Sequence, residues 1–369
     1  MPLRIATFNI ENLMARFDFS GFRHENRQDR VVRMFGVSDK ELYRDLEQAR
    51  LISETDDTRQ LSALAIAATG ADILCLQEVD DMAALNSFER AYLSRMMGVG
   101  YRQKVLVEGN DTRGIDVALM MRDKTRDGQP IQLVEVRSHA ALTYQQLGLF
   151  TPQIALTNKP DDRVFRRDCL EVDVRIGNKP LTIYVLHLKS MTQSRDDTDG
   201  RFASMPVREA EVRAVRHIIE RRFGTDGAGT ASFVICGDMN DYQERLKVTG
   251  DQFSGYAFEP VREEMSALDI FTRDGFADNI VRRRPEMDRW TLFHSRGPEE
   301  QHLCQLDYIF LSQALARHNP DAFPEIIRQG QPYRTAMPAG QQVERFPRVG
   351  WDRPKASDHC PVVVSLELP

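Results

Sequence analysis

The stretch SFVICGDMND, residues 232–241, joins an apolar run to a turn rich in glycine and polar residues. Its first five residues are typical of a buried strand, because β-branched and aromatic side chains pack well in a sheet. Asp238 and Asn240 follow at the carboxyl end of that strand, the edge where α/β sheets usually carry their sites. Their i, i+2 spacing in an extended segment directs both side chains to the same side. A tight turn is the simpler interpretation, since Gly, Asp and Asn all favour turns.

Five more motifs place polar side chains at or just beyond the end of an apolar strand. They are FNIEN at 8–12, LQEV at 76–79, HLKS at 187–190, LDY at 306–308 and SDH at 357–359. Each alone has an ordinary structural explanation: a glutamate after a strand is usually solvated, and asparagine, serine and aspartate often cap strands, turns and helices. Their co-occurrence along the chain predicts that they form one site.

The rest of the chain alternates short apolar runs with helical periodicity, which is typical of an α/β fold. Further strands are expected at Leu3–Ile10, Ala71–Gln77, Ile115–Met121, Ile131–Val136, Cys169–Ile176, Leu181–His187, Leu306–Leu311 and Val362–Leu366. Helices are expected after the capping box Ser38–Glu41, along the apolar face Leu61–Ala68, and over Met82–Met97 and Val207–Phe223. No linker or repeat divides the chain. Met14–Arg33 and Arg317–Lys355 are poorly patterned, as long functional loops often are.

Composition narrows the class of protein. Hydrophobic residues make up 41% and charged residues 28% of the 369 residues, and no apolar run is long enough to cross a membrane. The N-terminus leads directly into a strand without a leader, so we expect a protein of the cytoplasm. The five dispersed cysteines suit buried reduced thiols. The net charge of −6 argues against a chain that coats itself in polyanion, although 41 of its 49 basic residues are arginine. Arginine suits phosphate contacts, but genomic composition is the more ordinary explanation of the bias.

The motifs FNIENL, GIDVALMMR, HLKS, GDMND and SDHCPV together resemble the endonuclease/exonuclease/phosphatase superfamily, and among its members the bacterial nuclease-like branch. The similarity runs from Asn9 to His359. It implies a deoxyribonuclease I-like fold of the α/β (α+β) class: a four-layer sandwich of two packed mixed β-sheets flanked by helices. It also implies a single domain over residues 1–369, with long loop insertions at about 14–59 and 317–355.

The resemblance assigns a metal site to four residues. Glu78 matches the family's metal-binding glutamate, Asn9 and Glu11 match the pair on the first strand that supports metal and phosphate, and Asp358 matches the acidic residue beside the terminal histidine. Mg²⁺, with Mn²⁺ or Ca²⁺ as alternatives, prefers oxygen ligands and needs only one or two carboxylates. No cysteine or histidine cluster has the spacing of a zinc site.

The resemblance also implies the catalytic residues. His359 matches the histidine at the scissile phosphate, and Asp307 matches the aspartate that hydrogen-bonds it and fixes its tautomer. Asp238 and Asn240 match the pair that orients the attacking water. His187 matches a second histidine found in deoxyribonuclease- and sphingomyelinase-like members. Apurinic endonucleases usually carry tyrosine there, so His187 argues against a dedicated abasic-site enzyme.

A second set of residues is expected to bind substrate, although each has an ordinary alternative as a surface, turn or capping residue. The set comprises Arg113, Asp116, Arg166, Arg167, Lys189 and Ser190. Asp116 could in addition hydrogen-bond His187.

These assignments predict a metal-dependent phosphodiesterase that uses in-line attack of water, and we expect a nuclease acting on DNA or RNA. Support comes from arginine-rich stretches interleaved with aromatic residues, a pattern that suits unpaired bases. The arginines are Arg23, Arg27, Arg30, Arg33, Arg166, Arg167, Arg282–Arg284, Arg345, Arg348 and Arg353. We expect Trp290 and Trp351 to anchor loops on the core instead.

Two other functions remain open. A lipid or small-molecule phosphodiesterase or phosphatase, similar to a sphingomyelinase, is favoured by the mildly apolar stretch Leu142–Leu156, which could touch a membrane interface. A binding protein on a decayed nuclease scaffold would have lost a metal ligand or the Asp358–His359 pair, and neither is lost. The sequence indicates no protein partner.

Overall fold

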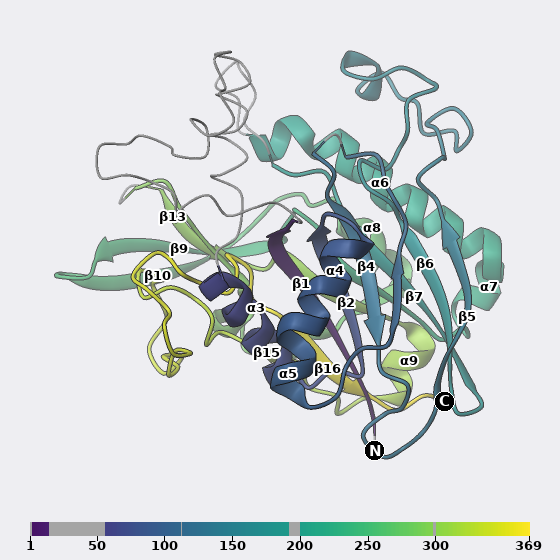
Figure 1. Ribbon diagram of the computed structural model, residues 1–369. Helices are drawn as coiled ribbons and strands as arrows, with labels where there is room; N and C mark the ends of the chain where they lie inside the picture. The colour runs from purple at the N-terminus through teal and green to yellow at the C-terminus, as the bar shows by residue number, and fades with distance from the viewer. Residues whose placement is uncertain (1, 15–55, 112, 192–199, 298–299) are drawn as a thin grey trace, which may run out of the picture.

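The computed structural model describes residues 2–14, 56–111, 113–191, 200–297 and 300–369. The helix expected after Ser38, the arginines at 23–33 and most of the 14–59 insertion lie outside these ranges. Two six-stranded sheets form the centre of the molecule, as Figure 1 shows.

The first sheet has the order β15-β16-β1-β2-β4-β3. Its strands are β1 (Leu3–Leu13), β2 (Ile73–Val79), β3 (Gln103–Leu106), β4 (Asp116–Met121), β15 (Glu325–Ile326) and β16 (Val362–Leu366). β1 and β2 run parallel, and the other neighbours are antiparallel. Because β1 and β2 are parallel, the motifs at their carboxyl ends lie at the same edge of the sheet.

The second sheet has the order β11-β14-β8-β7-β6-β5. Its strands are β5 (Ile131–Ser138), β6 (Leu170–Ile176), β7 (Lys179–His187), β8 (Phe233–Asp238), β11 (Ala277–Asn279) and β14 (Asp307–Ser312). β7 and β8 are its parallel pair, so His187 and Asp238 end side by side.

The two sheets pack face to face around one apolar layer. Residues of alternating position from both sheets fill it, among them Cys75 and Val117 from the first and Val185 and Cys236 from the second. The period-2 alternation of a strand directs these side chains inward and their neighbours toward the helices. All five cysteines are buried as free thiols, as expected from their positions in apolar runs.

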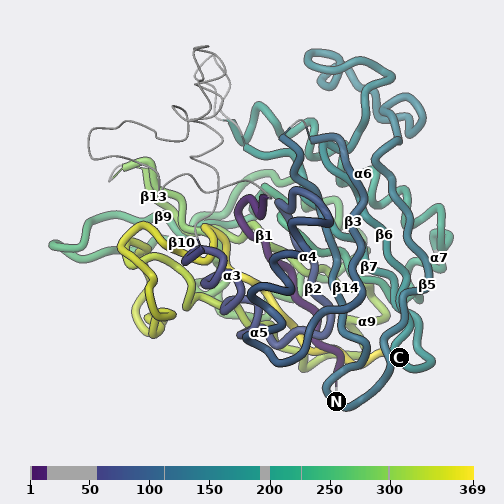
Figure 2. Tube along the Cα trace, viewed as in Figure 1, coloured from purple at the N-terminus to yellow at the C-terminus, as the bar shows by residue number. Residues whose placement is uncertain are grey.

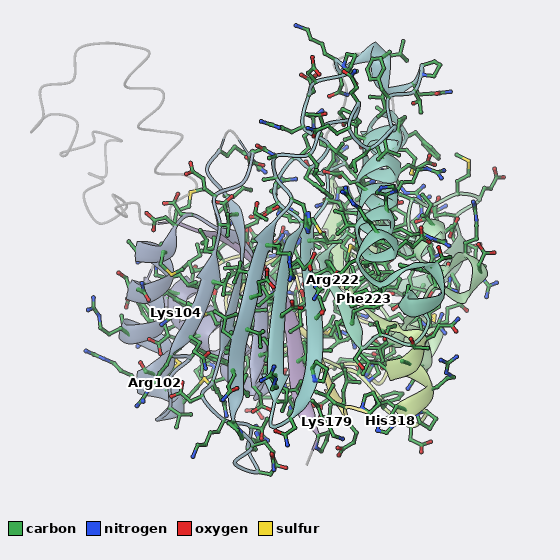
Figure 3. The ribbon with its side chains drawn as sticks, turned by 90° about the vertical axis from the view of Figure 1, so that its right-hand side faces the viewer. Arg102, Lys104, Lys179, Arg222, Phe223 and His318 are labelled. Atoms are coloured by element: carbon green, nitrogen blue, oxygen red, sulfur yellow. The ribbon has the colours of Figure 1, made fainter. Side chains whose placement is uncertain are left out.

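Helices cover the outer face of each sheet (Figure 1). The first sheet carries α3 (Asp56–Thr69), α4 (Met82–Phe88), a π-helical turn at Glu89–Leu93 and α5 (Ser94–Met97). The second carries α6 (Gly200–Phe223), followed by the single turn α7 (Thr225–Ala228), with α8 (Asp269–Thr272) beside them. Figure 3 shows Arg222 and Phe223 at the end of α6, close to the strands of this sheet. This arrangement confirms the predicted four layers; the single domain stays a prediction.

Short helical elements connect the layers. They are the 3-10 turns Ile154–Leu156, Arg273–Gly275, Ile280–Arg283 and Glu286–Asp288, and the helix α9 (Gln313–His318). The helix expected over Met82–Met97 is present, but the π turn interrupts it, and it ends at Gly98 in the left-handed conformation that glycine favours. Both chain ends lie at the side of the sheets opposite the tip of β1 (Figure 2).

A third sheet, which the sequence pattern did not predict, has the order β10-β9-β13-β12. Its strands are β9 (Glu244–Asp251), β10 (Gly255–Arg262), β12 (Leu292–Ser295) and β13 (Gln301–Cys304). Its apolar face packs on Trp290, Ala336 and Met337. The poorly patterned stretch 317–355 therefore supports this sheet from behind. The strands escape prediction because β12 and β13 are only four residues long, and β9 and β10 mix apolar residues with charged residues, glycine and proline.

We predict that Gly237→Ala strongly destabilises the protein. Gly237 has φ 144°, and a Cβ there would lie 1.9 Å from the carbonyl oxygen of Leu186 on the neighbouring strand. We expect the free energy of unfolding, measured by urea denaturation, to fall by about 3 kcal/mol or more, because backbone of β7 must move. Gly227→Ala is the control, since the added Cβ meets only Phe223 at ordinary distance. Equal stability of the two variants would contradict the prediction.

Candidate active site

The ends of β1 and β2 are bulged, and the bulges direct the first site residues. The register between these strands shifts between Asn9 and Leu13, and the β2–β4 register shifts around Glu78. Glu11, Asn12 and Glu78 all have positive φ values, of 56°, 62° and 66°. Such backbone is strained for residues with side chains and is typical of functional sites, where bulges redirect side chains. The backbone N–H of Asn12 then donates to Glu78 Oε2 at 3.0 Å.

The end of β8 contributes Asp238 and Asn240. The sequence predicts an extended backbone at Asn240. The backbone there is left-handed instead, with φ 47°. The two side chains nevertheless meet, because this turn folds Asn240 back: its backbone N–H donates to Asp238 Oδ1 at 2.9 Å, and its Nδ2 donates to Oδ2 at 3.1 Å. GDMND therefore forms a turn, and the catalytic roles of Asp238 and Asn240 stay a prediction.

One side chain joins the two sheets at this edge. Asn9 Nδ2 donates to Asp238 Oδ2 at 3.0 Å and to Glu78 Oε1 at 3.4 Å. Its own Oδ1 accepts from the backbone N–H of Glu11 at 3.0 Å. Asn9 thus holds the carboxylates of β2 and β8 against each other while its orientation is fixed by the bulge.

His359 and Asp307 form the closest side-chain pair of the site. His359 Nδ1 lies 2.8 Å from Asp307 Oδ2, and His359 Nε2 lies 3.8 Å from Asp238 Oδ2. Burial alone would lower the pKa of this imidazole, but the carboxylates of Asp307, Asp238 and Asp358 raise it well above 6.5. His359 is therefore an imidazolium at neutral pH, with Nε2 directed toward Asp238.

His187 has the opposite charge state. Its Nε2 lies 3.4 Å from Asp238 Oδ2 and 4.0 Å from Glu78 Oε1. Burial and the nearby Arg167 guanidinium lower its pKa well below 6.5, so the ring is neutral. The expected hydrogen bond from Asp116 is absent: Nδ1 has no partner among the described residues, and Asp116 accepts from the backbone N–H of Gly109 at 2.7 Å instead. The Asp116 carboxylate therefore bonds the backbone of the Gly109 loop and not the ring of His187.

The carboxylates crowd one another. Burial and the Asp358 and Asp238 carboxylates, against the opposing effect of His359, raise the pKa of Glu78 to about 7. Burial likewise raises the pKa of Asp238 to about 6, against the opposing effect of His359. A divalent cation would relieve this repulsion, so the donor set fits one. Among the described residues no three His, Cys, Asp or Glu side chains form a cage for a metal. Magnesium does not need one, because it keeps several waters.

Glu11 and Asp358 lie on either side of the same loop. Glu11 Oε2 accepts from the backbone N–H of Asp358 and pairs with Lys355, both at 2.9 Å, and its Oε1 pairs with Arg353 at 2.9 Å. Both oxygens of Glu11 are therefore engaged by the terminal loop. Asp358 lines the cavity beside Glu78 and His359. The geometry thus favours Glu78 and Asp358 over Glu11 as the carboxylates that face a ligand.

A cavity of about 560 Å³ opens over these residues. Arg113, Arg167 and Ser190 of the expected substrate-binding set line it, together with Glu78, His187, Asp238, Asn240, Asp358 and His359. Asp111 holds the two arginines, at 3.1 Å from Arg113 Nε and 2.8 Å from Arg167 Nε. The other three members of the set are outside the lining. Arg166 contacts Asn158, Lys189 Nζ donates to the Ser190 carbonyl at 3.1 Å, and Asp116 bonds Gly109.

Several supporting residues carry no motif of their own. Gln331 Nε2 donates to the carbonyls of Ser357 and His359 at 3.1 Å each. Thr291 Oγ1 accepts from the N–H of Asp307 at 3.1 Å. Glu211 on α6 accepts from the N–H groups of Arg166 and Lys189, at 3.0 and 2.8 Å. Each lies far in sequence from the group it holds, so local pattern could not reveal it. A buried glutamate inside an apolar helical face is the one available signal, and Glu211 shows it.

Comparisons with known proteins agree with this geometry. The family model described as "Endonuclease/Exonuclease/phosphatase family" matches residues 6–359. No curated protein matches the sequence. Among solved structures, the human Nocturnin catalytic domain with bound sulfate is similar at 16% identity and TM-score 0.52, covering 100% of this chain and 94% of that one.

Two Bacteroides thetaiotaomicron structures are also similar. One is an endonuclease/exonuclease/phosphatase family protein, at 13% identity and TM-score 0.51, covering 100% of this chain and 98% of its own. The other is a mannosyl-6-phosphatase, at 12% identity and TM-score 0.51, covering 99% and 100%. At these identities the three structures show the fold alone.

We predict that Glu78→Gln stabilises the metal-free protein above neutral pH. The pKa of Glu78 is about 7 in the folded protein, against an ordinary value of 4.5. The folded state therefore binds this proton more tightly than the unfolded state does. The stability that Glu78 contributes is present below pH 4.5 and is lost as the pH rises from 4.5 through 7. In EDTA at pH 8 the variant should gain about 1–3 kcal/mol in urea unfolding, and at pH 4.5 nothing.

Added Mg²⁺ should raise the melting temperature of the wild type more than that of Glu78→Gln. Glu209→Gln, on the exposed side of α6, is the matched control and should follow the wild type in both experiments. A variant that loses stability at pH 8 in EDTA would show that Glu78 makes favourable contacts that outweigh the repulsion.

Proposed function

Because the chain belongs to the endonuclease/exonuclease/phosphatase family, whose members hydrolyse phosphoric esters, we propose that it is a metal-dependent phosphodiesterase that cleaves nucleic acid. One observation carries the proposal. Glu78, Asp238 and the His359–Asp307 pair, drawn from four strands and loops far apart in the sequence, converge on a single cavity. A non-catalytic scaffold has no need for this arrangement.

The residues divide the work according to their charge states. Asp238 is the group that orients water and accepts its proton, because its pKa of about 6 makes it a stronger base than an ordinary aspartate and Asn240 fixes its position. His359, as an imidazolium, donates to a phosphoryl oxygen. Neutral His187, which lies beside the Asp238 carboxylate, contacts a second phosphoryl oxygen. Pairs of groups whose pKa values diverge are typical of acid–base sites.

Glu78 and Asp358, supported by Asn9, would hold Mg²⁺. When bound, the cation polarises the phosphoryl oxygens and neutralises charge on the leaving group. The Glu78 and Asp358 carboxylates repel each other, so a cation bound between them would be stabilised by both charges. Mn²⁺ or Ca²⁺ would fit the same oxygen ligands.

Exposed aromatic residues beside the site favour nucleic acid as the substrate. Trp351 and Tyr333 are 57% and 56% exposed, and Arg353, next to Trp351, reaches Glu11 at the site. Trp351 therefore does not anchor its loop on the core, as the sequence suggested, whereas Trp290 does. Aromatic side chains at the rim of a phosphodiesterase can stack unpaired bases.

Other expected phosphate contacts have structural partners instead. Arg283 donates to the carbonyls of Asn319 and Ala322, and Arg284 donates to that of Pro324. Arg348 pairs with Asp57 at 2.7 Å. These arginines fasten loops. The case for nucleic acid therefore depends on the rim formed by Tyr333, Trp351 and Arg353.

A lipid phosphodiester is the second candidate substrate, favoured by an apolar groove of about 470 Å³ beside the cavity. Phe202 and Met265 line it and are half exposed, and Leu156 nearby in the sequence stretch 142–156 is 83% exposed. Phe202 follows Gly200 and Arg201, which line the catalytic cavity. In the described part of the chain no helix is long and apolar enough to cross a membrane. The bacterial cytoplasm as its location stays a prediction.

A substrate panel tests the proposal: single-stranded DNA, plasmid DNA, RNA, sphingomyelin and bis(p-nitrophenyl) phosphate, each with Mg²⁺ and with EDTA. We expect Mg²⁺-dependent cleavage of nucleic acid, most rapid on single strands because unpaired bases can reach the rim aromatics. Trp351→Ala should reduce cleavage of single-stranded DNA and leave bis(p-nitrophenyl) phosphate unaffected. Cleavage of sphingomyelin alone would favour the lipid candidate. Binding without turnover in any metal would favour a scaffold.

We further predict that Asp307→Asn lowers kcat/KM by about 10²–10⁴-fold, because it removes the negative charge that keeps His359 protonated and replaces the carboxylate that orients the ring with an amide. The pKa of His359, followed by NMR of its ring protons, should fall in the variant. Asp278→Asn, on β11 next to β14, is the control. An unchanged pKa of His359 would contradict the assigned role of Asp307.

A further inference from the structure

The catalytic cavity extends beyond the hydrolytic residues along the third sheet. Leu292 on β12 forms a bridge with His359, and the N–H of Cys360 donates to the Thr291 carbonyl at 2.7 Å. The sheet therefore starts at the catalytic histidine and continues outward from it. Figure 1 shows β9 and β13 projecting from the two central sheets on this side.

The strand register places four cationic or ionisable side chains on the cavity face of this sheet. Arg245 lies opposite Cys304 on β13, and His302, two residues from Cys304, lies opposite His294 on β12. Arg296 continues the same alternation beyond the end of β12. All four line the cavity, whereas the intervening Leu246, Phe293 and Leu303 point into the apolar core behind the sheet. We name Arg245, His294, Arg296 and His302 the distal wall.

The electrostatic surroundings of the distal wall favour an anion. Burial, together with the nearby His294, Arg245 and Arg296, lowers the pKa of His302 to about 3. Carboxylates offset part of the positive charge of the wall: Glu263 pairs with Arg245 Nε at 2.9 Å, and Glu300, which also lines the cavity, lies 3.6 Å from Arg296 Nη1 and 3.3 Å from His294 Nε2. Lys247 on β9 lies directly opposite His302 in the register and adds a further positive charge.

The chemistry of the wall points to phosphate among possible anions. Guanidinium groups bind phosphate oxygens in a bidentate manner, and imidazoles donate from their ring nitrogens. The rings of His294 and His302 stack on each other with centroids 4.8 Å apart, so each covers one face of the other. That leaves less ring surface for a nucleobase and keeps the nitrogen edges as the reactive part of the pair.

We propose that the distal wall binds a second phosphate of the substrate, adjacent to the phosphodiester that is cleaved. His294 is two residues along β12 from Leu292, the residue bridged to His359, which corresponds to about 7 Å along a strand. A neighbouring phosphate of a polynucleotide chain can span such a separation. The inference rests on the proposed phosphodiesterase activity and specifies its substrate: a chain with more than one phosphate, rather than an isolated diester.

Dithymidine substrates test this proposal, because each contains one scissile diester. TpT has no other phosphate, pTpT adds one on the 5′ side and TpTp adds one on the 3′ side. With Mg²⁺, we expect kcat/KM for pTpT or TpTp to exceed that for TpT by about tenfold or more, as a charge-assisted hydrogen bond would give. Arg245→Gln and His302→Gln should abolish this preference and leave TpT hydrolysis within about twofold of wild type, while Arg245→Lys should keep part of it.

Arg262→Gln is the matched control, because Arg262 lies on β10 of the same sheet, opposite Glu244, and so faces away from the cavity. It should keep the full preference. Equal rates of wild type on all three substrates, or an unchanged preference in both Arg245→Gln and His302→Gln, would overturn the proposal.

A second measurement separates this proposal from the proposed activity. In EDTA, inorganic phosphate should shift the NMR signals of the His302 ring toward the protonated form in the wild type and in Arg262→Gln, and not in Arg245→Gln. The signals are identified by their loss in His302→Gln. If no dithymidine is cleaved, the phosphodiesterase activity fails and this titration alone decides the subsite. No shift in the wild type would then exclude it.

Discussion

The amide of Asn9 donates to Asp238 at 3.0 Å, and this single contact crosses from one central sheet to the other. The proposed catalytic site depends on the alignment of the two sheets that this hydrogen bond requires. The parallel pairs β1–β2 and β7–β8 end at the same edge, so Glu78 and His187 approach Asp238 from two separate sheets. A relative slip of the two sheets by one residue, about 3.3 Å, would move Asn9 and Glu78 out of contact with Asp238. The apolar layer between the sheets, with its alternating contributions from both, fixes that register.

Forming the site costs conformational free energy, and the strained backbone positions lie close to the cavity. Four non-glycine residues near the cavity, Glu11, Asn12, Glu78 and Asn240, have left-handed backbone. Two of them, Glu78 and Asn240, belong to the set proposed to bind metal or water, where buried carboxylates also repel one another. Strain and repulsion of this kind persist only where surrounding contacts determine the geometry. Here Gln331, Ser357 and Thr291 supply those contacts around the histidine.

Strands with a clear local pattern could be predicted from the sequence, whereas contacts between residues far apart in the sequence could not. The central strands were found because runs such as 73–79 and 233–238 are apolar at nearly every position, as buried parallel strands are. The family resemblance then supplied the roles of Glu78, Asp238 and His359, which the pattern alone left as turn and cap residues. The third sheet was missed because His294, His302 and Arg245 interrupt its apolar residues. The partner of Asp116 was left open between His187 and an ordinary turn contact, since nothing local indicates that the N–H of Gly109 bonds it.

The distal wall occupies one continuous stretch of chain, from Arg245 to His302, between the catalytic positions Asn240 and Asp307. Its rear face contacts the 317–355 stretch through apolar packing and through hydrogen bonds such as that from Trp290 Nε1 to Gln341 Oε1 at 2.8 Å. The hairpins β9–β10 and β12–β13 lie outside the two central sheets, so an ancestor could exchange these hairpins for others without altering Glu78, Asp238 or His359. Selectivity in such a protein can diverge between close relatives while the chemistry is inherited unchanged, and overall identity between two chains becomes a poor guide to whether they share a substrate.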